Sequence, residues 1–170
     1  MSDIILMVGI QGSGKSTWAN NFVEEHDKVI YISRDTIRKE LIGDGEYFSK
    51  EDEVWETFCN SMVEAVQAQG EWDYIIIDAT HISIGSRRKV LNEITKRTDT
   101  SKYNLKITVM DTPLLTCLHR NDERTGFEFV PKSVIKRFSE QFDMPTLEEF
   151  DIFKNKFNDI DIIHVKEGNN

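Results

Sequence analysis

Apolar residues recur along this chain in five short runs rich in β-branched side chains, and each run predicts a β-strand. Three of the runs are almost continuously apolar rather than alternating, which is typical of strands buried on both faces of a parallel sheet. The predicted strands are Asp3–Gly9, Lys28–Ile32, Asp73–Ala79, Leu105–Met110 and Ile160–Val165.

Between these runs the apolar residues follow a helical period, so that strands and helices alternate. This alternation predicts an α/β fold with a parallel sheet and right-handed crossovers. Capping boxes that begin at Ser49 and Thr146, and Gly70 at the end of the longest helix, support the boundaries. The predicted helices are Ser16–Glu25, Asp35–Leu41, Lys50–Gln69, Arg87–Arg97, Leu114–Glu123 and Lys132–Phe142.

Length and composition bound the class of protein. The chain has 170 residues, of which 39% are hydrophobic and 30% charged, as in one soluble domain that buries a core. We expect one domain over residues 1–170, with a frayed tail over residues 166–170. No apolar run is long enough to span a bilayer, and the first residues lack a basic signal segment. Because Cys59 and Cys117 have no metal-ligand spacing, we expect a cytoplasmic protein, in the host cytoplasm if the source is viral.

The acidic balance of the chain limits how it could bind nucleic acid. The formal net charge is −9, from 21 basic and 30 acidic residues. Proteins that grip long duplexes through many phosphates usually carry the opposite sign. A nucleic-acid partner would therefore be held by local contact, at an end or over a few nucleotides. Solubility is the simplest alternative explanation of the acidity.

A complete phosphate-binding motif follows the first predicted strand. The run from Gly9 to Ser16 reads G-x-x-x-x-G-K-S and stands between a strand and an amphipathic helix, the context that this loop requires. Its glycines let backbone N–H groups converge on phosphate oxygens, Lys15 reaches the terminal phosphates, and Ser16 would place its hydroxyl on Mg²⁺. We expect ATP or another nucleoside triphosphate, with Mg²⁺, to bind through Gly12, Ser13, Gly14, Lys15, Ser16 and Thr17.

The end of the second predicted strand indicates a kinase. A GTPase is excluded, because N-K-F-N at residues 155–158 lacks the aspartate that reads guanine. Ser33-Arg34-Asp35 instead ends a strand at the edge of a parallel sheet where ligands bind. The Asp35 carboxylate there can accept the proton of a substrate hydroxyl, and Arg38, one turn later, would face a bound anion. Asp35 could also serve as a helix N-cap.

Polar residues at the end of the third predicted strand supply a metal candidate. Asp78 stands where a carboxylate commonly holds the water shell of magnesium, although it could simply terminate the strand. Thr80 and His81 follow in a loop, where Thr80 is a candidate acceptor contact and a lone histidine is often incidental. Arg88, in the basic run 87–89, is suited either to substrate phosphates or to a solvated helix face.

Two arginines near residue 120 predict a lid over about residues 112–131. Arg120 and Arg124 lie four residues apart on a predicted helix that Gly126 closes. Like charges on one helix face are unfavourable unless an anion lies between them. A lid that folds over the triphosphate would supply this anion and would stabilise the moving phosphoryl group. Pairing of these arginines with Asp122, Glu123 or Glu128 is the alternative.

The order of these motifs resembles the kinase domain of phage-type 5′-polynucleotide kinase, from residue 3 to about residue 142. Many kinases share the P-loop, whereas the combination of R-D-x-x-R, R-N-x-x-R and V-P is more selective. The residues that carry the resemblance are the P-loop run from Ile4, Arg34-Asp35 with Arg38, Glu46-Tyr47, Asp78 to Thr80, Arg87-Arg88, Arg120 to Arg124, Val130-Pro131 and Val134-Ile135.

The resemblance implies a role for each matched residue. The match to Asp35 is the general base for the 5′-hydroxyl, and the match to Arg38 holds a phosphate of the acceptor strand. The matches to Lys15, Ser16 and Arg124 serve the nucleotide and its metal. The implied fold is adenylate-kinase-like, a P-loop kinase with a five-stranded parallel sheet flanked by helices and a short helical lid. The expected catalytic residues are Lys15, Asp35 and Arg124, with Arg120 also at the nucleotide, Arg34, Asp35, Arg38, Thr80 and Arg88 at the acceptor, and Ser16 and Asp78 (through water) at the metal.

The chain also departs from the family pattern. The D-x-D-G-T signature of the 3′-phosphatase domain found in the best-known members is absent, so repair of 3′ ends is not expected. Thr125 adds one residue between the lid arginine and Gly126, and Phe127-Glu-Phe129 makes the lid less basic. His81 stands where the family usually has asparagine.

The expected function is ATP-dependent phosphorylation of the 5′-hydroxyl of a DNA or RNA end, as in nucleic acid repair. A P-loop kinase for a small alcohol, a nucleoside or an aminoacyl-tRNA is the alternative, because motif spacing does not exclude those acceptors. A nucleotide-dependent switch without catalysis is a third. The oligomeric state stays open, although a core role is the simpler explanation of the Phe-rich stretch from Phe138 to Phe157.

Overall fold

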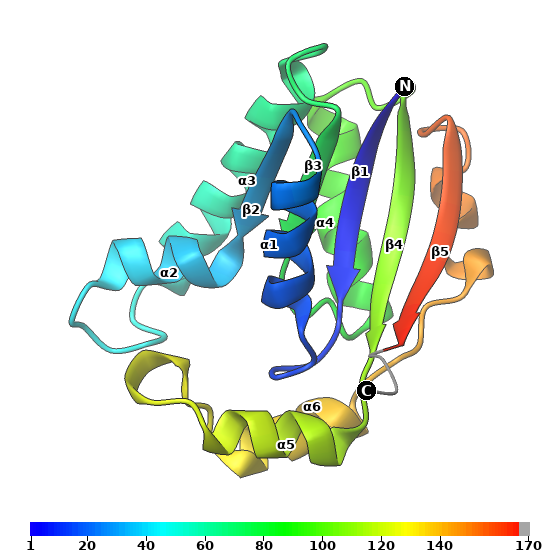
Figure 1. Ribbon diagram of the computed structural model, residues 1–170. Coiled ribbons are helices and arrows are strands. Elements are labelled where there is room, and N and C mark those ends of the chain that lie inside the picture. The colour runs from blue at the N-terminus through cyan, green and yellow to red at the C-terminus, as the bar shows by residue number, and fades with distance from the viewer. Residues whose placement is uncertain (167–170) are drawn as a thin grey trace.

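A parallel β-sheet with the strand order β2-β3-β1-β4-β5 forms the centre of the structure (Figure 1). The computed structural model describes residues 1–166, in which this sheet has five strands. The predicted P-loop kinase fold and its five strands are confirmed. The strands are β1 (Ser2–Val8), β2 (Val29–Ser33), β3 (Tyr74–Asp78), β4 (Tyr103–Asp111) and β5 (Asp159–Lys166). Lys166 ends β5, and the rest of the predicted tail lies outside the described residues.

Helices cover both faces of the sheet because alternate side chains of each central strand point to opposite sides. Ile4 and Leu6 of β1 pack in a core with α3, α4 and the C-terminal 3₁₀ helix, whereas Ile5 and Met7 pack against α1. Figure 1 shows two further helices, α5 and α6, across the carboxyl end of the sheet. The helices are α1 (Lys15–Glu25), α2 (Arg34–Ile42), α3 (Glu51–Gln67), α4 (Ile84–Arg97), α5 (Leu114–Asp122) and α6 (Lys132–Glu140), with the 3₁₀ helices η1 (Gly126–Glu128) and η2 (Leu147–Phe153).

The strand register places the chemically important loops side by side. Ser33 at the end of β2 is level with Asp78 at the end of β3, and β3 pairs in turn with β1, which leads into the P-loop. The Gly9 N–H donates to the Thr80 carbonyl oxygen at 2.9 Å, which ties the P-loop to the loop after β3. The three loops therefore meet at one edge of the sheet, as expected for parallel strands.

Local side-chain hydrogen bonds explain where some helix ends differ from the prediction. α4 begins three residues earlier than predicted, because Ser83 and Ser86 form a reciprocal capping box. The predicted capping box at Ser49 is wrong. The Ser49 hydroxyl donates to the Glu46 carbonyl at 2.7 Å, and Lys50 is the N-cap of α3. The box at Thr146 is confirmed. Gly70 lies two residues beyond the C-cap of α3, in a turn with φ +84°.

The basic run at residues 87–89 does not form one exposed cluster. Arg87 of α4 is buried. It donates to both carboxylate oxygens of Glu149 at 3.0 and 2.9 Å and to the His81 carbonyl at 2.8 Å. Arg88 is exposed, and the Lys89 ammonium lies 4.3 Å from the centre of the Trp55 ring. Within residues 1–166, no helix is long and apolar enough to cross a lipid bilayer.

Candidate active site

The P-loop between β1 and α1 has the backbone shape that a phosphate cradle needs. Gly12 and Gly14 have φ values of 80° and 96°, in the left-handed region that glycine tolerates best. A side chain at Gly12 would also place its Cβ 2.7 Å from the Cys117 carbonyl oxygen of α5. This close packing of backbone on backbone makes glycine necessary at Gly12, and it joins the loop to the lid.

The ammonium group of Lys15 is held by two carbonyl oxygens and is affected by several charged residues. Its ammonium donates to the carbonyl oxygens of Gly9 at 2.8 Å and Ile10 at 3.0 Å. Burial lowers the pKa of Lys15, the charges of Asp78 and Asp35 raise it, and the charge of Arg124 lowers it. Charges from three other segments of the chain, at the ends of β2 and β3 and after α5, therefore act on the P-loop lysine.

The loop residues fit the phosphates of a nucleotide. The Ser13 hydroxyl is buried and has no hydrogen-bond partner among the residues that the structure describes. Ser16 and Thr17 are exposed in the first turn of α1, where backbone N–H groups and the helix dipole favour an anion. A phosphate oxygen is a group that would satisfy these donors.

Asp78 is a buried carboxylate held by a tyrosine. It is 5% exposed, and burial raises its pKa, while the Lys15 charge and a hydrogen bond from the Tyr31 hydroxyl lower it. Burial also raises the pKa of Tyr31, and the nearby hydroxyls of Ser16 and Ser33 lower it. Tyr31 therefore donates to Asp78 of β3 and lies near Ser16 of the P-loop.

Ser16 and Asp78 fit a magnesium ion that retains much of its water. Among residues 1–166, no cluster of three or more His, Cys, Asp or Glu side chains could hold a metal. Mg²⁺ commonly binds through one or two protein oxygens, several waters and the phosphates of its substrate. A hydroxyl and a carboxylate beside the P-loop fit this mode, and the bound ion would neutralise phosphate charge.

On the other side of the site, Asp35 belongs to a network on α2. Its side chain is 67% exposed, yet it accepts hydrogen bonds from Arg38 and, at 3.0 Å, from the Tyr47 hydroxyl. Arg38 also donates to Glu51 of α3 at 2.6 and 3.0 Å, and these bonds lower the pKa of Glu51. Ser33, rather than Asp35, caps α2, since its hydroxyl accepts from the Thr36 N–H. Asp35 therefore faces outward as a held carboxylate.

The other residues that were predicted to bind the acceptor substrate differ in how they contact this network. Arg34 approaches Glu51 at 3.5 Å and lies 5.3 Å from the centre of the Trp55 ring. Its Nε is buried and has no hydrogen-bond partner within the described residues. Thr80 is half-buried in the loop after β3, and Arg88 is exposed on α4. Arg34 thus contacts Glu51, which also binds Arg38 of the Asp35 network. The side chain of Arg88 makes no hydrogen bond, ion pair or ring contact with residues 1–166.

The sequence predicted that the two lid arginines lie on one helix face, and this prediction is wrong. α5 ends at Asp122, so Arg124 follows the helix and Gly126 belongs to η1. Arg120 donates to the Gly12 carbonyl at 3.2 Å. Arg124 is half-buried, affects the pKa of Lys15, and has no ion-pair partner within residues 1–166. The predicted alternative partners contact other basic side chains: Asp122 lies 3.5 Å from Lys132, Glu123 lies 3.6 Å from His119, and Glu128 lies 3.1 Å from Lys39.

His81 has a structural contact that the sequence did not predict. It is buried, with φ +45°, and its Nδ1–H donates to the Met7 carbonyl at 2.7 Å. Because that bond requires the proton on Nδ1, Nε2 is a bare acceptor, and it has no partner among the described residues. Burial lowers the pKa of His81 to about 4. His81 therefore joins the ends of β1 and β3 as a neutral side chain.

Sequence reasoning missed three side chains of the site: Tyr31, Tyr47 and Glu51. Tyr31 stands two residues before Ser33 and so shares its face of β2, a signal that the sequence did carry. Tyr47 was noted only as part of a resemblance. Glu51 begins α3, where an acidic residue is ordinary, so its pairing with Arg38 left no local signal.

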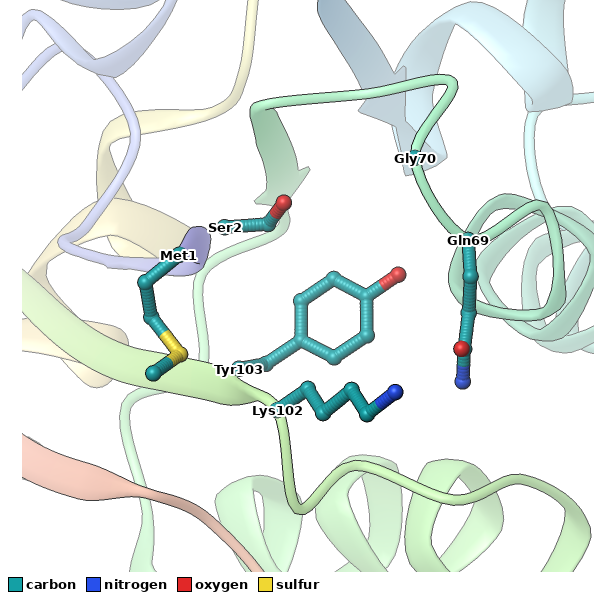
Figure 2. A pocket seen from close by; sticks show the side chains of 6 residues that line it. All are labelled: Met1, Ser2, Gln69, Gly70, Lys102 and Tyr103. Atoms are coloured by element: carbon teal, nitrogen blue, oxygen red, sulfur yellow. The ribbon is translucent and has the colours of Figure 1, made fainter.

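A surface pocket at the opposite edge of the sheet is separate from this site. Figure 2 shows the Tyr103 ring between the Met1–Ser2 end of the chain and the turn at Gln69 and Gly70, with Lys102 beside it. Ser2 and Tyr103 begin their strands, whereas the P-loop follows the other end of β1. The Tyr103 hydroxyl already donates to the Val66 carbonyl at 2.8 Å.

Comparisons with known proteins show which proteins this chain resembles. A protein of Autographa californica nuclear polyhedrosis virus, described as a bifunctional polynucleotide kinase/RNA ligase, is 22% identical; the match covers 91% of this chain and 23% of that protein. A chain from the Pnkp1/Rnl/Hen1 RNA repair complex is 28% identical, with a TM-score of 0.66, over 82% of this chain and 43% of that chain. The present chain thus spans less than half the length of either relative.

More distant structures share the fold alone. A fungal RNA kinase superposes with a TM-score of 0.70 at 15% identity, over 99% of this chain and 76% of that one. A sugar kinase from Janibacter superposes with a TM-score of 0.60 at 16% identity, over 98% and 86%. The fold therefore does not distinguish nucleic-acid acceptors from small alcohols.

The family model described as an AAA domain, AAA_33, matches residues 4–145, which include the P-loop, the ends of β2 and β3, and the lid. This match spans most of the chain, and the relatives above confirm the resemblance to polynucleotide kinases. The chain belongs to the AAA_33 family of P-loop domains, in the form of a P-loop kinase fold.

Proposed function

We propose that this protein transfers the terminal phosphate of ATP, with Mg²⁺, to the 5′-hydroxyl of a DNA or RNA end. The observation that supports this proposal best is the Asp35 carboxylate. It is exposed, it is held by Arg38 and Tyr47, and it lies close enough to Lys15 for its charge to raise the lysine pKa. The polynucleotide kinase relatives support the class of acceptor.

In the proposed reaction, Asp35 takes the proton of the acceptor hydroxyl while the oxygen of that hydroxyl bonds to the terminal phosphorus of ATP. The bond from that phosphorus to the bridging oxygen breaks, and ADP leaves with the bonding electrons. Lys15 and Arg124 balance the negative charge on the phosphates, and bound Mg²⁺ would supply further neutralisation. Tyr47 and Arg38 hold the Asp35 carboxylate in place before the acceptor arrives.

Arg38 is proposed to bind a phosphate of the acceptor strand. Its contacts with Glu51 fix the guanidinium plane. The Arg38 side chain is itself buried, and its Nη1 contacts Tyr47 and Asp35, whose side chain is 67% exposed. A phosphate of the acceptor strand would bind this Arg38 nitrogen, either together with Asp35 or in its place. Arg38→Ala should therefore raise KM for the oligonucleotide more than it lowers kcat.

The test is the transfer of a γ-labelled phosphate from ATP to a 5′-hydroxyl oligonucleotide. Asp35→Asn should lower kcat at least about 100-fold, because the amide cannot accept the proton, and should leave ATP affinity within about twofold. Asp44→Asn is the matched control, an exposed aspartate on the loop after α2, and should retain full activity. Normal turnover by Asp35→Asn would remove Asp35 from the mechanism.

The same assay separates the acceptor classes. A panel of nucleosides, sugars and aminoacyl-tRNA should be labelled much less well than DNA or RNA with a free 5′-hydroxyl. Labelled small alcohols together with unlabelled oligonucleotide would overturn the proposed acceptor but retain phosphoryl transfer. Nucleotide binding without transfer to any acceptor would point to a switch instead of an enzyme.

A further inference from the structure

Two adjacent aromatic residues stand in the loop between α2 and α3. The Phe48 side chain is 70% exposed, whereas Tyr47 is partly buried. Their ring centres are 4.5 Å apart, and the ring planes meet at 80°. An isolated exposed phenylalanine is ordinary on a protein surface. This one differs because its neighbour holds it in a defined place.

Tyr47 connects the aromatic pair to the proposed general base. Its hydroxyl donates to Asp35 at 3.0 Å and accepts from Arg38 at 3.1 Å. The Arg38 guanidinium lies 4.7 Å from the centre of the Tyr47 ring and 5.8 Å from that of Phe48. Since Glu51 holds Arg38 through two further bonds, the rings rest on a rigid base before any ligand binds.

The aromatic pair also lies beside Asp35, where the acceptor hydroxyl is proposed to bind. Figure 1 shows the loop between α2 and α3 on the same side of the sheet end as the lid. Lys39 of α2 contacts Glu128 of the lid at 3.1 Å, so α2, which carries Asp35, also contacts the lid. Phe48 stands one ring beyond the tyrosine that contacts Asp35.

These features match the way proteins hold single-stranded nucleic acid. Nucleobases stack on exposed aromatic rings without regard to sequence, and arginine beside the ring adds cation–π attraction. An arginine near the strand also pairs with its phosphates. A small alcohol would have no planar group for this surface, so a solvent-facing ring at this place favours a base-bearing acceptor.

We propose that Tyr47 and Phe48 form a stacking platform for a nucleobase within the first two nucleotides of a single-stranded acceptor. The proposal rests on the proposed function, since it takes the 5′-hydroxyl to lie at Asp35. Phe48 supplies the exposed face, and Tyr47 supports that ring and sets its distance from the reacting end. A base stacked on the platform would hold the terminal hydroxyl near Asp35. The stacking would not depend on which base is present.

The test compares acceptors that have or lack the base. Phe48→Ala should lower kcat/KM for a single-stranded 5′-hydroxyl oligonucleotide about 5- to 150-fold, the equivalent of the ~1–3 kcal/mol that one stacked base contributes. Removal of the base at the first or second nucleotide should lower kcat/KM of the wild type by a similar factor. With that abasic acceptor, Phe48→Ala should have no further effect, and Phe48→Trp should retain the activity on the intact strand.

Ile152→Ala is the matched control, because Ile152 is 60% exposed on η2, away from the P-loop. It should leave both acceptors unchanged. Equal loss by Phe48→Ala on intact and abasic strands, or no loss on either, would overturn the platform. Wild-type protein that labels no oligonucleotide would contradict the proposed function instead. A thermal unfolding midpoint close to that of wild type will show that Phe48→Ala folds, as expected for an exposed side chain.

Discussion

Asp78 shows how a single side chain is prepared for its role by its neighbours. A carboxylate that is 5% exposed would resist ionisation, yet Lys15 and the Tyr31 hydroxyl both favour its charged form. The Tyr31 bond also fixes the orientation of the carboxylate. We propose that Tyr31 is a positioning residue for the proposed metal site, as are side chains that orient metal ligands from behind.

We predict that Tyr31→Phe weakens the binding of Mg²⁺ at the proposed metal site. The Mg²⁺ concentration at half-maximal phosphoryl transfer should rise about tenfold, because the loss of such an orienting bond commonly costs 10- to 100-fold in metal affinity. Titration of Mg²⁺ at saturating ATP measures the change. Tyr74→Phe, on the neighbouring strand β3, is the control, and identical titrations for both variants would contradict the role of Tyr31.

His81 predicts a pH dependence of stability. Its pKa in the folded protein is lowered to about 4, below the ordinary value of about 6.5 in an unfolded chain. The unfolded state therefore binds a proton that the folded state excludes, with Arg34, Lys15 and Arg87 opposing the charge. The free energy of unfolding should fall as pH decreases from about 6.5 to about 4, by up to ~3 kcal/mol.

Chemical denaturation at pH 7 and pH 4.5 tests this prediction. His81→Asn keeps an amide that can donate to the Met7 carbonyl but does not titrate, so its stability should change less between the two pH values. His164→Asn, at an exposed position of β5, should behave like the wild type. Equal pH dependence in wild type and His81→Asn would show that His81 does not carry this proton linkage.

At the scale of elements, α4 and η2 are joined by one buried ion pair. The side chains of Arg87 and Glu149 are 0% and 4% exposed, and Glu149 also accepts from the Thr146 N–H that begins η2. Arg87 further holds the His81 carbonyl. The pair thus links the C-terminal segment, α4 and the loop behind the site.

Arg87→Met should destabilise the protein by about 3–5 kcal/mol, because it leaves the Glu149 carboxylate buried without its partner. The double variant Arg87→Met, Glu149→Leu should lose less, since no unpaired charge remains. Urea unfolding of both variants against wild type gives the comparison. A double variant that is less stable than Arg87→Met would indicate that the pair stabilises by more than mutual neutralisation.

At the scale of the whole molecule, the charge of −9 sets how strongly salt affects acceptor binding. Only the few cations near Asp35 would meet strand phosphates, and each phosphate contact on a single strand contributes a slope of about −0.7 in log K against log salt. We predict a slope between about −1 and −2 for a short 5′-hydroxyl oligonucleotide. Arg38→Ala should make the slope less negative by about 0.7.

Fluorescence anisotropy of a labelled oligonucleotide between low and moderate salt measures this slope. Lys154→Ala, at an exposed position after η2, is the control and should leave the slope unchanged. A wild-type slope steeper than about −4 would mean that the strand runs along a broad basic surface, in conflict with the acidic composition.

Much of the fold was predictable because its signals are local. Runs of apolar residues fixed the five strands, and the glycines with Lys15 identified the P-loop, since each pattern lies within a dozen consecutive residues. The site was predictable only in part. The positions of Asp35 and Asp78 were predicted because parallel strands end at one edge. The helical placement of Arg124 and the capping box at Ser49 were wrong.

The amino-acid sequence by itself determined an α/β P-loop domain and the sheet edge where its chemistry lies, because strand periodicity and loop glycines act through the nearest residues. Only the tertiary structure decided the partners: Tyr31 with Asp78, Glu51 with Arg38, Tyr47 with Asp35, and Glu149 with Arg87. These pairs are separated by 47, 13, 12 and 62 residues. Their proximity depends on strand order and on how helices pack across the sheet, and no local pattern of residues encodes it.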